Sequence, residues 1–250
     1  MDLLRLELAT LWTLDSSGNL ADIPTTPAMP VPMIALAGNP SGLIWAYGPT
    51  VPKKVQSRCN ELLEATSLPG EVGWQPATRE LLLGVLATVS PIGPPVCGPS
   101  YLIPPELDRT PPADVLTGGE HDRDTLSGLM PDDARLALRP PWAVAVRSGR
   151  AVAICETARD TPRSVEAGVR TESEFRRQGL GTAVTLAWSV LVKDRVAFYS
   201  TSWDNAASQG VARALGLTPM GQWWQVYTSA PADTSSALGD VASLADVRAL

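Results

Sequence analysis

The segment from Ser164 to Leu191 constrains the fold more than any other part of this sequence. It begins with SVEAGVRT, a run that predicts a β-strand, and continues with a polar loop, ESEFRRQGLG. The helix predicted next has one apolar face, formed by Leu180, Val184, Ala187 and Leu191. Backbone N–H groups at a helix start attract anions, and the glycines and arginines of this loop favour a phosphate. The alternative is that Gly179 and Gly181 only form a tight turn between strand and helix.

The elements on both sides of this segment predict a mixed domain of strands and helices. Before it, PWAVAVRSGRAVAICETA (141–158) has two strand-like runs joined by RSGR, which is typical of a β-hairpin. After it come a short strand, RVAFYS, and a helix, NAASQGVARAL, that ends at Gly216. The last strand is GQWWQVYTS. The predicted order is therefore β-β-β-α-β-α-β.

Residues 1–110 predict an N-terminal accessory α/β unit. Prolines and turn signals interrupt this region, which contains short strand-like runs such as GLIWAYG and two helical runs, KKVQSRCNELLEA and ATRELLLGVLATV. The prolines from 104 to 112, with the polar stretch that follows them, predict a linker or a long connection. We therefore expect an accessory unit over 1–110, a second domain over 111–230 and a C-terminal tail over 231–250.

Composition excludes several classes of function. The chain has 20 Lys and Arg against 26 Asp and Glu, with no basic block, so we expect neither a nucleic-acid partner nor a membrane partner. Cys59, Cys97 and Cys155 fit neither a disulfide framework nor a zinc motif and are expected to be reduced. The single histidine, His121, lies in a polar loop, which argues against a histidine triad and excludes histidine metal clusters. No metal site is predicted.

The N-terminus and the apolar runs bear on localisation. The first residues lack both a basic segment and a cleavage site of small residues, so they are a poor signal peptide. No apolar run is long enough to cross a bilayer. We therefore expect a cytoplasmic protein.

The element order and the R-x-x-G-x-G motif together resemble the GNAT superfamily of acyl-CoA-dependent N-acyltransferases, over about Trp142 to Tyr227. The resemblance implies an α/β (α+β) fold with a mixed, mainly antiparallel sheet flanked by helices, and acetyl-CoA as cofactor. In that family the signature Q/R-x-x-G-x-G/A wraps the pyrophosphate of the cofactor. Here the signature and its next residue are Arg176, Arg177, Gln178, Gly179, Leu180, Gly181 and Thr182.

Two further family elements have counterparts in this chain. In the family an asparagine opens the next helix and hydrogen-bonds the pantetheine arm, and Asn205 occupies this place. The alternative is that Asp204 or Asn205 is only an N-cap. The strand before the glycine motif pairs with pantetheine amides in the family, which implies backbone contacts from Val169, Arg170 and Thr171. The N–H of Val169 or Arg170 would also polarise the thioester carbonyl.

The catalytic groups match the family less closely. Many members have a glutamate at the same spacing before the motif, which makes Glu166 the candidate general base and Glu156 the second choice. A structural or solvent-facing role is the alternative. Many members also place an acidic tyrosine seven residues after the asparagine, where this chain has Ala212. Ser208, which is also expected beside the cofactor, Tyr199 or a water would then have to act as the acid.

Together these features predict an N-acetyltransferase that transfers an acetyl group from acetyl-CoA to a primary amine. The acceptor is a small-molecule amine or a peptide, and a homodimer is allowed. Because of Ala212 and the unassigned N-terminal region, the alternative is an acyl-CoA-binding regulatory or interaction module without turnover. Residues 1–110 could also be a degenerate copy of the same fold, although they lack a glycine motif. Trp203, Trp223 and Trp224 either contact the acceptor or pack in a core.

Overall fold

The computed structural model describes residues 3–21, 30–65, 76–107 and 114–229, and it divides the chain into two compact units. Of these residues, unit 1 contains those up to Ser100 and those from Met220 onwards, whereas unit 2 contains 101–219. The division differs from the expected boundaries at 110 and 230, because the last strand joins unit 1. The expected C-terminal tail, 231–250, lies outside the described residues.

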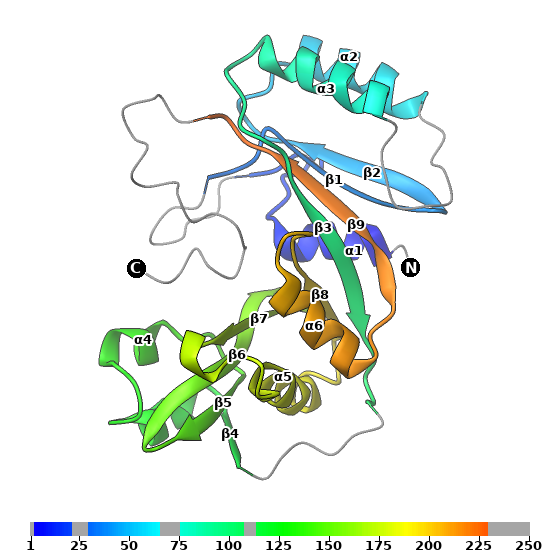
Figure 1. Cartoon of the computed structure of the whole chain (residues 1–250). Coiled ribbons are helices and arrows are strands. Elements are labelled where there is room, and N and C mark those ends of the chain that lie inside the picture. The colour runs from blue at the N-terminus through cyan, green and yellow to red at the C-terminus, as the bar shows by residue number, and fades with distance from the viewer. Residues whose placement is uncertain (1–2, 22–29, 66–75, 108–113, 230–250) are drawn as a thin grey trace. The chain divides into compact units, whose positions relative to one another are not determined.

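Unit 1 has helices on both faces of an antiparallel sheet (Figure 1). Strands β1 (Ile34–Asn39), β2 (Gly42–Tyr47) and β9 (Pro219–Val226) lie in the order β2-β1-β9. Helices α2 (Lys53–Glu64) and α3 (Pro76–Ala87) pack on one face and α1 (Leu3–Leu11) on the other. Successive β1 residues alternate between the faces: Ile34 and Leu36 join the cluster under α2 and α3, and Ala35 joins the cluster under α1.

Three features of unit 1 differ from the sequence analysis or extend it. The N-terminal segment, considered there only as a poor signal peptide, forms α1, in which Leu4, Leu8 and Leu11 are buried. Strand β1 was not predicted from the sequence. Nearly all of its residues are buried, so its sequence has no alternation of polar and apolar residues. The last strand pairs with β1, with Leu36 opposite Trp224 and Ile34 opposite Val226. It therefore completes the core of unit 1.

Unit 2 is built on a mixed sheet in the order β8-β7-β6-β5-β4. Its strands are β4 (Val115–Gly118), β5 (Trp142–Arg147), β6 (Arg150–Asp160), β7 (Ser164–Thr171) and β8 (Val196–Ser200). The β7–β8 pair is parallel and the other pairs are antiparallel, which confirms the predicted GNAT-like mixed, mainly antiparallel sheet. Helices α5 (Leu180–Leu191) and α6 (Ala206–Leu215) also lie in this unit, and β3 (Val96–Ile103) crosses from unit 1 into unit 2.

The turns of unit 2 follow the local sequence signals. The hairpin between β5 and β6 turns at Ser148 and Gly149, whose φ angles are 51° and 73°. Two consecutive left-handed residues match the twist of a two-residue hairpin, as RSGR predicted. Helix α6 ends at Gly216, which is also left-handed at φ 70°. Local chemistry thus sets these boundaries.

The segment 114–137 is more ordered than a linker. It forms β4, a 3-10 helix η1 (Glu120–Leu126) and a short helix α4 (Asp132–Ala137). Leu126 and Leu138 are almost fully buried against Trp142, Val144 and Ile154, on the opposite sheet face from α5. These few apolar anchors among polar residues leave no periodic pattern, which explains why the sequence did not reveal them. His121, expected in a loop, lies in η1.

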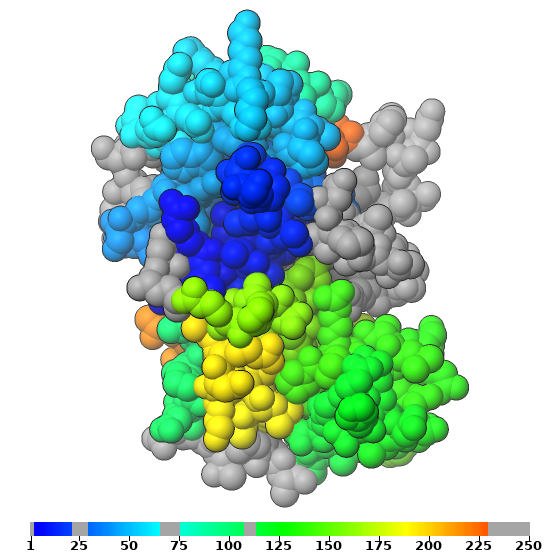
Figure 2. Space-filling view, turned by 180° about the vertical axis from the view of Figure 1, so that it is seen from behind, coloured from blue at the N-terminus to red at the C-terminus, as the bar shows by residue number. Residues whose placement is uncertain are grey.

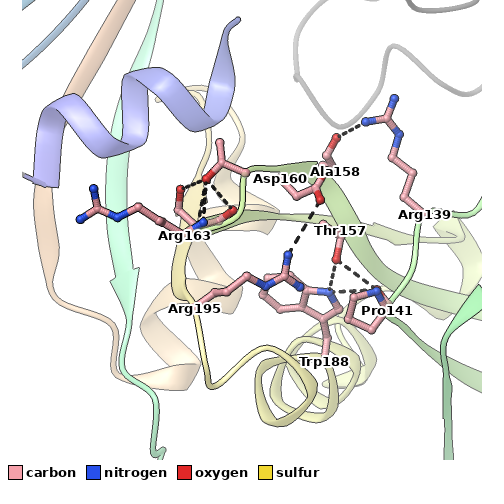
Figure 3. A network of polar contacts seen from close by, with 10 residues as sticks. Arg139, Pro141, Thr157, Ala158, Asp160, Arg163, Trp188 and Arg195 are labelled. Atoms are coloured by element: carbon pink, nitrogen blue, oxygen red, sulfur yellow. Dashed lines mark hydrogen bonds and ion pairs between the residues drawn. The ribbon is translucent and has the colours of Figure 1, made fainter.

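Helix α5 is fixed to the sheet in its C-terminal half and just beyond its C-terminus. In its C-terminal half, Trp188 Nε1 donates to the carbonyl of Pro141 at 3.1 Å and lies 3.2 Å from Thr157 Oγ1 (Figure 3). Beyond its C-terminus, Val196 N donates to Arg163 O at 3.0 Å, and Arg195 lies 3.9 Å from Asp160. Figure 2 shows the surface of the segment that includes α5, in yellow, beside the surface of the segment that includes β7, in yellow-green. These contacts hold the helix across β5, β6 and β7.

Candidate functional site

The two parallel strands of unit 2 separate immediately after Glu166. Their register ends at the pair Glu166 with Phe198, although β7 continues to Thr171 and β8 to Ser200. On its other side, β7 stays paired with β6 as far as Ala153 opposite Thr171. Residues 167–171 thus have a recorded ladder partner on β6 but none on β8. The predicted backbone contacts of Val169, Arg170 and Thr171 fall in this separated part, where an extended ligand can add as a strand.

Glu166 is a buried carboxylate at this point of separation. Its side chain is 4% exposed, and Oε1 accepts hydrogen bonds from Ser200 N and Ser200 Oγ, both at 2.7 Å. Its other oxygen, Oε2, is buried without a hydrogen-bond partner among the described residues. Burial raises the pKa of Glu166 from 4.5 to about 7, and the hydrogen bonds from Ser200 and the charge of Arg159 oppose this rise. The group can therefore accept a proton near neutral pH.

Glu156, the second candidate base, is held by neighbouring groups. It is 5% exposed, and its Oε2 accepts a hydrogen bond from the backbone N–H of Arg139 at 2.8 Å. Its Oε1 lies 3.8 Å from Arg170 Nη2. The carboxylate therefore links β6 to the chain just before β5 and to the side chain of Arg170, an arrangement that favours a structural role.

The loop before α5 is anchored through an ion-pair network. Arg150 lies 2.7 Å from Glu172, also contacts Glu174, and sits 5.7 Å from the ring centre of Phe175. These contacts surround the 3-10 helix η2 (Ser173–Phe175). Arg176 Nε donates to Thr171 O at 3.2 Å, and Gln178 Nε2 donates weakly to Glu174 O at 3.4 Å. The side chains of Arg176 and Gln178 thus help to shape the loop.

The start of α5 has the features expected of an anion site. Its N-cap residue, Gly179, has no side chain that could cap the helix, and the first hydrogen bond of the helix runs from Ala183 N to Gly179 O at 2.9 Å. The N–H groups of Leu180, Gly181 and Thr182 therefore lack acceptors within the helix. Arg177 is exposed, and no contact of its side chain is recorded among the described residues. These donors and this charge fit the diphosphate of a CoA molecule.

The two glycines of the motif have different roles. Gly179 is left-handed at φ 78°, and a Cβ there would meet nothing within 4 Å, so the position needs glycine for its backbone. A Cβ on Gly181 would instead lie 3.1 Å from Val211 Cγ2 and 3.4 Å from Thr171 Oγ1. Gly181 therefore allows α5 to pack closely against α6 and β7. The alternative of a tight turn thus fits the backbone of Gly179, whereas Gly181 is needed for the packing of α5.

Asn205 and Ser208 form the N-terminal cap of α6. Asn205 Oδ1 accepts a hydrogen bond from Ser208 N at 3.0 Å. The oxygen of the Asn205 side chain therefore acts as the N-cap of α6, as the alternative predicted. No hydrogen bond of the Asn205 side-chain NH2 is recorded in the described part of the chain, so it remains available to a ligand. Ser208 Oγ lies 2.7 Å from the hydroxyl of Tyr199, which is buried and whose pKa is raised by that burial. The Ser208 hydroxyl is therefore oriented by Tyr199.

The remaining positions separate core residues from accessible ones. Ala212 is fully buried on the inner side of α6, in the cluster that also contains α5. Trp223 and Trp224 belong to β9 in unit 1, where Trp223 is 3% exposed, so they are packing residues. Trp203, in the loop before α6, is 43% exposed, and its carbonyl oxygen accepts a hydrogen bond from Gln209 Nε2 at 2.8 Å. Of the three tryptophans, Trp203 remains as a candidate acceptor contact.

Other parts of the structure offer weaker candidates. A cavity in unit 1 lies between α1 and the sheet, beside Trp12 and Trp223, and its volume of about 10 Å³ has room for one water molecule. The described residues contain no group of histidine, cysteine and acidic side chains that could hold a metal ion. Within the same ranges, no helix is long and apolar enough to span a membrane. The candidate site therefore lies in unit 2.

Sequence reasoning missed one residue of this site, Ser200. Its importance comes from the parallel pairing of β7 with β8, which places it against Glu166. No local motif marks a serine at a strand end, so only the tertiary arrangement identifies it.

No protein-family model matches the sequence, and no curated protein matches it. Solved structures do. A GNAT-family acetyltransferase from Colwellia psychrerythraea is 16% identical, with a TM-score of 0.43 over 74% of this chain and 76% of that chain. A GCN5-related N-acetyltransferase from Sphaerobacter thermophilus is 14% identical, with a TM-score of 0.43 over 78% and 76%. An aminoglycoside N-acetyltransferase in complex with CoA is 22% identical, with a TM-score of 0.32 over 45% and 92%. As the motif predicted, these structural neighbours are GNAT-family acetyltransferases.

Proposed function

We propose that this chain is an N-acetyltransferase that transfers an acetyl group from acetyl-CoA to a primary amine. The observation that carries the proposal is Glu166, a buried carboxylate where β7 and β8 separate, one oxygen of which has no hydrogen-bond partner among the described residues. A buried carboxylate oxygen without a hydrogen-bond partner costs stability, and groups retained at such a cost are typical of functional sites. Beside the separated strand and the open start of α5, that use is proton acceptance from an amine.

The residues that would hold acetyl-CoA are distributed along the separated strand and two helix starts. The N–H groups of Leu180–Thr182 and the charge of Arg177 would bind the diphosphate. The backbone of 167–171 would pair with the pantetheine amides, and the NH2 of Asn205 would donate to the same arm. Bound acetyl-CoA supplies an acetyl group activated as a thioester.

In this arrangement Glu166 acts as the general base. An amine is mostly protonated near neutral pH, so attack on an acyl group requires a proton acceptor within hydrogen-bond reach or linked by water. With a pKa of about 7, Glu166 is ionised in a useful fraction of molecules at that pH. The N–H of Val169 or Arg170 would polarise the acyl carbonyl. Ser208, oriented by Tyr199, is the candidate proton donor in place of the family's tyrosine.

The alternative is an acyl-CoA-binding regulatory or interaction module without turnover. It is favoured by Ala212, which is fully buried where the family's tyrosine acid would stand. For the enzyme, we propose a small-molecule amine or a peptide as acceptor, a cytoplasmic location, no nucleic-acid or membrane partner, and a homodimer as the assembly to test.

The test measures free thiol released from acetyl-CoA across a panel of amines, peptides and aminoglycosides, with calorimetry of CoA binding alongside. We expect binding of CoA and thiol release with at least one acceptor. Binding without thiol release above the buffer rate would favour the module. Absence of CoA binding would reject both functions.

A further inference from the structure

We propose that Ser200 is a positioning residue that occupies one oxygen of Glu166, so that only the other oxygen is presented to the amine. The inference rests on the proposed function for its chemical meaning. Its geometry depends only on unit 2, and nothing in the sequence motif points to this serine.

Two donors from one residue converge on a single carboxylate oxygen. Ser200 N and Ser200 Oγ are each 2.7 Å from Glu166 Oε1, whereas Oε2 has no partner among the described residues. Ser200 is the last residue of β8, two positions beyond Phe198, the final partner of Glu166 in the parallel ladder. The side chain of Glu166 thus continues the link between the strands where the backbone ladder has stopped. These two hydrogen bonds fix the position of Oε1 and thereby restrain the direction of Oε2.

The charged and titratable groups around Glu166 leave Ser200 as its main stabilising partner. Arg159 on β6 is opposite Glu166 in the antiparallel register, and its charge favours the carboxylate. Cys155 on β6 and Tyr199 on β8 also act on it, but burial raises the pKa of each, so both are neutral near pH 7. Burial makes Glu166 a stronger base, and the Ser200 donors limit that effect. The serine therefore sets both the direction and the pH range of the base.

A purely structural serine makes a different prediction from a positioning serine. Loss of a structural hydrogen bond lowers activity at every pH, in proportion to the folded fraction. Loss of a donor to the carboxylate shifts the pH at which Glu166 ionises, and activity recovers once the pH exceeds the new midpoint. The pH dependence therefore distinguishes the two roles.

The experiment compares wild type with Ser200→Ala, Ser200→Thr and, as a matched control, Ser189→Ala. Ser189 is a buried serine of α5 whose hydroxyl donates to Leu186 O at 2.8 Å within its own helix. Side-chain carboxyl 13C NMR of glutamate-labelled protein follows the titration, and Glu166→Gln identifies the Glu166 signal. The same variants are assayed for kcat/KM against pH with the acceptor found in the thiol-release panel.

We expect Ser200→Ala to raise the Glu166 midpoint by about one pH unit, the size of one hydrogen bond to a charged group. Its kcat/KM should fall about tenfold below the wild-type midpoint and approach the wild-type value at high pH. Ser200→Thr retains a hydroxyl, so the midpoint of Glu166 should stay at the wild-type value. Ser189→Ala should also leave this midpoint unchanged.

The two readouts separate failure of the inference from failure of the proposed function. An NMR midpoint that does not move in Ser200→Ala, or that moves equally in Ser189→Ala or Ser200→Thr, overturns the role of the Ser200 hydroxyl. A midpoint that moves as expected while no acceptor releases thiol supports the role of Ser200 and rejects the transferase.

Discussion

Both units pack helices against a β-sheet, but they take the strands of that sheet from the chain in different ways. The five strands of unit 2 from β4 to β8 come from one continuous segment, and each of them pairs with the strand next to it in sequence. Unit 1 pairs β1 and β2 as a hairpin but takes β9 from the far end of the described chain. Unit 2 therefore owes its sheet to local signals, whereas unit 1 depends on one distant strand.

The largest expected effect tests that dependence. Val226→Asp places a charge at a β9 position that is 2% exposed and packed among residues of α2 and α3, so we expect a loss of at least about 4 kcal/mol in stability. Hydrogen exchange should show loss of protection in β1 and β2. Val190→Asp, at a position 47% exposed on α5, is the control and should change stability little. Equal effects of the two substitutions would contradict the dependence of unit 1 on β9.

Glu166→Gln tests a buried group of unit 2 that lowers the stability of the fold, whereas Val226 in unit 1 raises it. Folding raises the pKa of Glu166 from 4.5 to about 7, so between these values the folded state binds more protons than the unfolded state. Stability then falls as pH rises through this window, by roughly 3 kcal/mol in total. The variant should match wild type near pH 4.5, be more stable at pH 8, and lose about 10²- to 10⁴-fold in turnover.

Thermal melts at both pH values and the thiol assay check this prediction. A variant that is less stable than wild type at pH 8 would contradict a carboxylate buried at a cost. A loss of turnover much below tenfold would contradict its role as the general base.

Ala212→Tyr asks whether the family's tyrosine could be restored in unit 2. Because Ala212 is fully buried on the side of α6 that joins the cluster with α5, the ring must displace its neighbours, at a cost of about 1 to 3 kcal/mol. Ala214→Tyr places the same ring at an exposed position of the same helix and should be nearly neutral. Denaturant unfolding of both variants provides the comparison. A stable Ala212→Tyr with faster turnover would show that the cleft has room for the acid.

The smallest effect concerns Asn205, where a cap and a ligand contact are separable. Asn205→Ala removes the acceptor for Ser208 N and should cost about 1 kcal/mol. Asn205→Asp keeps that acceptor but loses the NH2 donor, so its stability should stay near wild type while its CoA affinity falls. Melting curves and calorimetry measure the two properties. If Asn205→Asp binds CoA as tightly as wild type, the residue is only a cap.

The predictability of the two units follows the same contrast. In unit 2, the hairpin at Ser148 and Gly149 and the end of α6 at Gly216 were predictable because each depends on a few adjacent residues. The glycine loop was predicted from its motif, and Glu166 was predicted only from the resemblance to the GNAT superfamily. The pairing of β9 with β1 was not predictable, because a strand's partner is a tertiary property. The Ser200 contact with Glu166 was missed for the same reason.

The placement of β9 also has a consequence for synthesis on the ribosome. As the nascent chain emerges, β1 and β2 are exposed long before their third strand has been translated, whereas β4 to β8 can assemble as soon as β8 appears. The middle of the polypeptide is therefore expected to fold before the N-terminal part is complete. Until β9 is made, one edge of β1 stays open to pairing with other chains, which makes this interval the one in which chaperone protection matters most.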